Sequence, residues 1–195
     1  TVVTGSRVHG GGSSAVFVKN SKGAVVARNR IADRPLTVRG ASSGVQLVDN
    51  ELSDAGILIE GYDDRKLGRV RPRRTTVRGG RVVAGGACIR VEDAEETRVD
   101  GVTLRCPKSI AVSGGSAVDL VAADVPAVGC AGEGVVRVLR AVDVKIVDRQ
   151  GHPVAGARIA GPGAAEADQS GRLRTEVVQE TTTCPGAKVE KASGL

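Results

Sequence analysis

The sequence predicts an all-β protein, a right-handed parallel β-helix of about six coils that runs into a small C-terminal β-sandwich-like module. Three observations support this. Valine dominates the apolar residues, the apolar residues recur with a period of about 21, and the period stops near residue 142. We therefore expect a β-helix over residues 1–141 and a module over residues 142–195.

The composition favours strands and turns over helices. The 195 residues include 32 Val against 10 Leu and 7 Ile, with 27 Gly, 7 Pro and no Met or Trp. Branched valine packs well on a pleated surface, whereas Gly and Pro interrupt helices. No apolar run reaches the ~18 residues of a membrane span, so no membrane contact is expected. The start lacks a signal-peptide pattern, and we expect a mature or trimmed fragment.

Three series of apolar residues follow the period. The first, with spacings of 21, 30, 22 and 21, is Ile31, Leu52, Val82, Leu104 and Val125. The second lies five positions earlier and comprises Val26, Leu47, Val77, Val99 and Leu120. The third, which has an apolar partner two residues before each member, comprises Val18, Val38, Ile59, Val91 and Val112. Stacked coils would bury all three series, so we expect three interior ladders.

Outward positions agree with this register. Arg30, Glu51 and Arg81 alternate in charge, as facing neighbours in a sheet prefer, and Asn29 and Asn50 suggest an asparagine ladder at a corner. The repeat resembles the pectin-lyase-like right-handed β-helix superfamily, a resemblance that implies an architecture and carries no catalytic motif. A leucine-rich repeat and an ordinary sandwich are the alternatives, although Val occupies most positions where a leucine-rich repeat needs Leu.

The C-terminal part contains two turns of the form Asp-x-x-Gly. One is Asp148 to Gly151, which leads into Pro153-Val-Ala-Gly-Ala, and the other is Asp168 to Gly171. The pattern resembles the carboxypeptidase-regulatory-like, transthyretin-like β-sandwich modules of secreted proteins. That resemblance implies an accessory unit in an extracellular setting, without chemistry of its own.

The four cysteines fit no zinc-binding spacing, so they are either disulfides of an oxidising compartment or buried thiols. Cys88 and Cys130 are 42 residues apart, or two periods. Equivalent positions two coils apart lie about 9.6 Å from each other, beyond the reach of a disulfide. We therefore expect no Cys88–Cys130 bond, and Cys106 with Cys130 is the better pair.

An insert of about nine residues within residues 62–74 lengthens one coil. Its six cations against Asp63 and Asp64 give a net charge of +4, two thirds of the +6 of the whole chain. The candidate ligand-binding residues are Arg65, Lys66, Arg69, Arg71, Arg73 and Arg74. Guanidinium groups suit carboxylates and sulfates, so a polyanionic glycan is the expected partner and a solvated loop is the alternative. Nucleic acid is not expected, because only Tyr62 could stack on bases.

Catalytic motifs are not recognised. Enzymes of the resembled superfamily would use facing carboxylates, and we assign none to neighbouring coils. The acidic corner of residues 92–96 could bind Ca²⁺ or be a solvated turn, and no other cofactor is expected. His9 and His152 are isolated, so a catalytic triad is not expected.

These observations predict an extracellular β-helix protein associated with polysaccharide, for binding or display rather than catalysis. A polysaccharide lyase or glycoside hydrolase is one alternative. A purely structural adhesin or fibre segment is the other.

Overall fold

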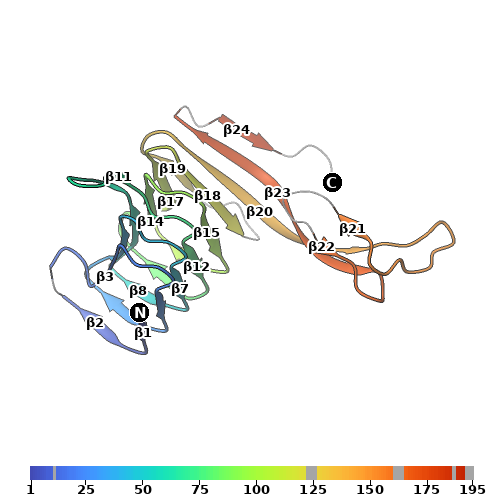
Figure 1. Ribbon diagram of the computed structural model, residues 1–195, viewed down its shortest axis with the longest axis horizontal. Coiled ribbons are helices and arrows are strands. Elements are labelled where there is room, and N and C mark those ends of the chain that lie inside the picture. Colours follow the sequence, from blue (N-terminus) through green and yellow to red (C-terminus); the bar gives the residue numbers. More distant parts are fainter. Residues whose placement is uncertain (11, 122–126, 160–164, 186–187, 192–195) are drawn as a thin grey trace.

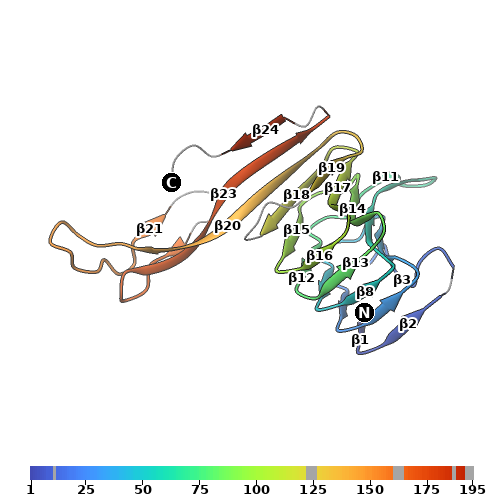
Figure 2. The same cartoon turned by 180° about the vertical axis from the view of Figure 1, so that it is seen from behind.

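The computed structural model describes residues 1–10, 12–121, 127–159, 165–185 and 188–191 of the chain. It is an all-β solenoid of about six stacked parallel coils, as predicted. Each of the first five coils contributes one short strand to each of three sheets, and a long hairpin extends from the last coils (Figures 1 and 2). The described residues form no helix that could cross a membrane.

Three sheets form the walls of the solenoid. The nine-stranded sheet begins with β1 (Val2–Thr4), β4 (Val25–Ala27), β7 (Gln46–Val48), β12 (Thr76–Arg78), β15 (Thr97–Asp100) and β18 (Ser116–Val121). The five-stranded sheet comprises β2 (Arg7–His9), β5 (Arg30–Ala32), β8 (Glu51–Ser53), β13 (Arg81–Val83) and β16 (Thr103–Arg105). The six-stranded sheet comprises β3 (Val16–Lys19), β6 (Leu36–Arg39), β9 (Ile57–Glu60), β14 (Ala87–Glu92), β17 (Lys108–Ser113) and β19 (Val128–Cys130).

The interior ladders form in the predicted register. In the nine-stranded sheet each member of the second series pairs with the next, and all are at most 3% exposed: Val26, Leu47, Val77, Val99 and Leu120. The first series pairs likewise from Ile31 to Leu104, while Val125 lies outside the described residues. The third series is in register from Val18 to Val112. Three sheets per turn, and the lack of helices among the described residues, exclude the leucine-rich repeat.

The asparagine ladder is also present, at the corner between the nine- and five-stranded sheets. The backbone N–H and the Nδ2 of Asn29 donate to Oδ1 of Asn50, at 3.1 and 3.0 Å. Nδ2 of Asn50 donates to the carbonyl of Val26 at 2.8 Å. Both side chains are buried, so these bonds satisfy polar groups that water does not reach.

The ladder ends at Gly80 for a steric reason. Gly80 has a φ of +77°, and a Cβ at this position would lie 2.3 Å from the carbonyl oxygen of Asn50. No side chain fits there, so an asparagine cannot continue the ladder.

The predicted insert is an antiparallel hairpin of β10 (Tyr62–Asp64) and β11 (Gly68–Val70). It projects from the stacked coils (Figures 1 and 2). The parallel register resumes at Arg73, which bridges Ser43 on one side and Glu95 on the other. The nine hairpin residues therefore account for the longer spacing of this coil.

The C-terminal residues extend the nine-stranded sheet. β20 (Gly134–Lys145) pairs in parallel with β18 and antiparallel with β23 (Arg172–Cys184), and β23 pairs with β24 (Lys188–Lys191). The predicted boundary at residue 142 falls inside β20. A further pair is formed by β21 (Arg158–Ile159) and β22 (Ala165–Glu166).

Both predicted Asp-x-x-Gly turns form. Oδ1 of Asp168 accepts hydrogen bonds from the backbone N–H groups of Ser170 and Arg172 and from the Ser170 hydroxyl. These bonds, the hydroxyl first, lower the pKa of Asp168 below its usual 3.8. Asp148 accepts corresponding bonds from Gln150 and His152.

The disulfide prediction was right for one pair and wrong for the other. The bonds are Cys88–Cys106 and Cys130–Cys184, so Cys88 and Cys130 are not joined, but Cys106 does not pair with Cys130. The alternative of buried thiols is wrong as well. The error came from assuming a constant period. Val112 pairs with Cys130 only 18 residues later, so Cys130 lies level with Val91 rather than with Cys88.

Candidate functional site

The tip of the basic hairpin carries two cations, Arg65 and Lys66. Arg65 and Lys66 are exposed, and no ion pair engages their side chains among the described residues. Asp64 shapes the turn by accepting hydrogen bonds from the backbone N–H groups of Lys66 and Leu67 and from the Tyr62 hydroxyl. These bonds, that of Lys66 first, lower the pKa of Asp64.

The arginines at the base of the hairpin meet the acidic corner of the next coil. Arg69 Nε lies 2.6 Å from Oδ2 of Asp93, and Arg71 Nε lies 2.6 Å from Oδ1 of the same residue. The second contact is an ion pair without hydrogen-bond alignment. Arg73 pairs with Glu95 at 3.1 Å. The hydrogen bond from Arg69 to Asp93 raises the pKa of Arg69.

Asp93 has its place because its neighbours along the corner are glycines. Asp93 is only 1% exposed, and a Cβ on Gly61 would lie 2.4 Å from its Oδ2. A Cβ on Gly114 would lie 2.8 Å from the Asp93 nitrogen. At this position of the stack there is therefore space for one buried carboxylate, that of Asp93, and the hairpin arginines cover it.

This pairing reduces the charge that the hairpin offers to a ligand. Arg69, Arg71 and Arg73 pair with Asp63, Asp93 and Glu95. When Asp93 and Glu95 are counted together with Asp63 and Asp64, six positive charges minus four negative charges leave +2 rather than +4. Arg74 donates to the Ser43 hydroxyl at 3.3 Å. Glycan binding by these residues stays a prediction, with Arg65 and Lys66 the most accessible of them.

The acidic corner is occupied by guanidinium groups, and a calcium ion would have to displace them from Asp93 and Glu95. Within the described ranges, no three His, Cys, Asp or Glu side chains gather in a metal-binding arrangement. Calcium binding therefore stays a prediction.

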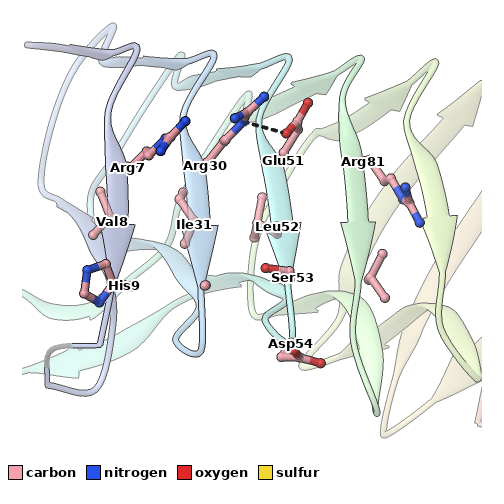
Figure 3. Close-up of a pocket in the computed structure, with 12 residues that line it drawn as sticks. Arg7, Val8, His9, Arg30, Ile31, Glu51, Leu52, Ser53, Asp54 and Arg81 are labelled. Atoms are coloured by element: carbon pink, nitrogen blue, oxygen red, sulfur yellow. Dashed lines mark hydrogen bonds and ion pairs between the residues drawn. The ribbon is translucent and has the colours of Figure 1, made fainter.

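A second candidate site, which sequence reasoning did not assign, is a groove of about 610 Å³ on the outer face of the five-stranded sheet. One row of outward side chains along it is Arg7, Arg30, Glu51 and Arg81, at the same position of four neighbouring strands (Figure 3). We call this the arginine row. The parallel second row is His9, Ala32, Ser53 and Val83.

The charges in the arginine row are not equally free. Arg30 Nε pairs with Glu51 at 3.0 Å, as the predicted alternation of charge indicated. Arg7 and Arg81 are exposed, and no ion pair or hydrogen bond engages their side chains within the described part of the chain. Asp54, which follows Ser53 at the edge of the groove, is exposed and likewise without a partner there.

The sequence contained a signal for this groove. Arg30, Glu51 and Arg81 were placed together from the period, but Arg7 lies 23 residues before Arg30, outside the first assigned coil. The pairing of β2 with β5 supplies that first coil and brings Arg7 level with Arg30. Only the structure distinguishes a paired arginine from an unpaired one.

The expectation that no carboxylates face each other on neighbouring coils was wrong. Glu60 and Glu92 occupy paired positions on β9 and β14. Each glutamate comes directly after a buried third-series residue, Ile59 or Val91, and so lies on the outer face of the six-stranded sheet. The insert between the two coils obscured the fact that the two glutamates occupy equivalent positions. Glu60 pairs with Arg39 at 3.2 Å.

Comparisons with known proteins identify no relative of this chain. No protein-family model, curated protein or solved structure matches the chain.

Proposed function

We propose that this protein binds an acidic polysaccharide outside the cell, using its rigid β-solenoid to hold a row of cations in line. The observation that carries the proposal is the arginine row. Arg7 and Arg81 point from one face of a sheet into the same groove, without partners of their own among the described residues (Figure 3). Guanidinium groups pair well with carboxylates and sulfates.

The proposed extracellular location is supported by the two disulfides, because such bonds persist in oxidising compartments. The Cys130–Cys184 bond ties β19 to the end of β23, and Cys88–Cys106 joins two coils. A solenoid fastened in this way suits a display role on a cell surface or in a matrix. The resemblances to pectin-lyase-like β-helices and to secreted accessory modules agree with that role.

The test is a binding titration with hyaluronan, polygalacturonate, alginate and heparin at two salt concentrations. Each exposed ion pair contributes only about 0.2–1 kcal/mol, so binding should be weak and multivalent. It should fall as the Debye length shortens from about 10 Å at 0.1 M salt to about 3 Å at 1 M.

The variant Arg7→Ser/Arg81→Ser should bind several-fold more weakly, with an unchanged melting temperature. The matched control Arg140→Ser/Arg149→Ser removes the same charge elsewhere and should bind like the wild type. A third variant, Arg65→Ser/Lys66→Ser, measures the share of the hairpin tip. Equal affinity of the wild type and the groove variant would refute the groove as the site, and no binding by the wild type would leave a purely structural role.

A second candidate function, glycoside hydrolysis, is favoured by the facing carboxylates Glu60 and Glu92. Such enzymes place two carboxylates on either side of the scissile bond. Release of reducing ends from the bound polysaccharides, lost in both Glu60→Gln and Glu92→Gln, would support it. No release by the wild type would count against it.

A further inference from the structure

The arginine row differs in charge between its ends and its middle. At one end are Arg7 and the neighbouring His9, and at the other is Arg81. The middle holds the Arg30–Glu51 pair, which is neutral in sum, and at the rim Asp54, which has no partner among the described residues. The groove is therefore cationic at its two ends and, counting Asp54, net negative between them.

We propose that the groove selects linear acidic glycans in which carboxylates are sparse, with uncharged sugar units over Glu51 and Asp54. This inference rests on the proposed function and names the class of glycan that the groove would take. Glu51 is then a specificity-determining residue, because it neutralises Arg30 and repels a carboxylate placed beside it.

The spacing of the strands sets the pattern that the groove would recognise. Neighbouring strands lie about 4.8 Å apart, so Arg7 and Arg81, three strands apart, are separated by about 14 Å along the row. A glycan along the row would have more than one sugar unit within that interval. If every unit carried a carboxylate, at least one would face Glu51 or Asp54.

The second row supports uncharged units in the middle. Ala32 and Ser53, on the strands of Arg30 and Glu51, are small, and they leave room beside that pair. Ala32 offers apolar contact for the C–H face of a sugar ring, and the exposed Ser53 hydroxyl can donate or accept a hydrogen bond. This lining suits a neutral sugar better than a carboxylate.

The experiment compares two polymers of matched length under the same salt conditions. Hyaluronan has one carboxylate per disaccharide, and polygalacturonate has one on every sugar. The wild type should bind hyaluronan more tightly per carboxylate. Glu51→Gln and Asp54→Asn should each improve binding of polygalacturonate over hyaluronan by roughly two- to fivefold, the value of one exposed ion pair. Asp119→Asn removes the same charge from the Asp119–Arg137 pair outside the groove and should leave the ratio unchanged.

The outcomes separate the two proposals. Binding of neither polymer by the wild type would overturn the proposed function. Binding of both, with a polymer ratio that is the same in Glu51→Gln, Asp54→Asn and Asp119→Asn, would overturn the selectivity alone. A gain of equal size for both polymers would reflect net charge and would also overturn the selectivity.

Discussion

Replacing Asn50 by alanine should be among the most damaging single changes on the corners of the solenoid. The substitution removes two hydrogen bonds from Asn29 to Oδ1 of Asn50 and one from Nδ2 of Asn50 to the Val26 carbonyl. Asn50 is 5% exposed and Asn29 is fully buried, so water cannot replace these bonds. The backbone N–H of Asn29 would be left without its acceptor, Oδ1 of Asn50, in a place that water does not reach.

The expected magnitude follows from the three bonds. Each contributes about 0.5–1.5 kcal/mol net, so the free energy of unfolding should fall by about 3 kcal/mol. For a chain of this size, 1 kcal/mol corresponds to about 2–4 °C, which gives a loss of about 6–12 °C in melting temperature. Urea unfolding followed by circular dichroism and differential scanning calorimetry would measure both quantities.

The matched comparison is Asn29→Ala. It removes the bond from Nδ2 to Asn50 and the bonds to Val3 and Ser6 in the first coil, where the backbone is partly exposed. Its cost should therefore be smaller, and a double-mutant cycle should give a coupling of about 1 kcal/mol between the two asparagines. A cost below about 1 kcal/mol for Asn50→Ala would refute the reasoning that the ladder is inaccessible to water.

Three further predictions concern the core, the hairpin and one turn. Leu47→Ala removes a side chain that is 1% exposed and should lower the free energy of unfolding in urea by about 2–5 kcal/mol. A loss as small as that of a typical surface substitution would contradict the ladder. Asp93→Asn should increase amide hydrogen exchange in residues 62–70, because Asp93 pairs with Arg69 and Arg71. Asp63→Asn, which affects an exposed ion pair, should change this exchange little. Equal effects of the two variants would mean that Asp93 does not hold the hairpin. The pKa of Asp168, measured by NMR, should lie below 3.8. The stabilisation of its turn is therefore complete at neutral pH and is lost as the pH falls through that lowered pKa. A titration midpoint at or above 3.8 would exclude the turn hydrogen bonds.

The interior of the fold could be predicted because its signal is local and repeated. Val26, Leu47 and Val77 each lie in a short alternating segment, and the distance between segments is nearly constant. A coil that lacked its apolar residues would leave a gap in a ladder, so the register is specified many times over. The asparagine pair was found in the same way, as a polar residue at a fixed offset from the ladder.

The cysteines show where counting residues fails. One coil has 18 residues between paired positions instead of about 21, which moved Cys130 along its strand relative to Cys88. Its true partner, Cys184, belongs to a strand that returns antiparallel from the C-terminal hairpin. No period in the sequence indicates how far such a strand returns.

The charges of the candidate site were misjudged for a similar reason. The hairpin residues alone sum to +4, but the carboxylates that pair with Arg69, Arg71 and Arg73 come from the next coil, more than twenty residues later. In the groove, by contrast, the row of Arg30, Glu51 and Arg81 followed directly from the period. The register fixes which residues are neighbours, and side-chain geometry decides which of them pair.

The sequence by itself determined the coil, its period and the side chains that face inward, because alternation along a strand and repetition between strands are properties of neighbouring residues. Only the tertiary structure decided which charges are free. Arg7 and Arg81 are left without partners in the described chain, whereas Arg69 and Arg71 close over the buried Asp93. The physical reason is that an ion pair depends on two side chains meeting within a few ångströms, and the coils bring together residues that the chain keeps far apart.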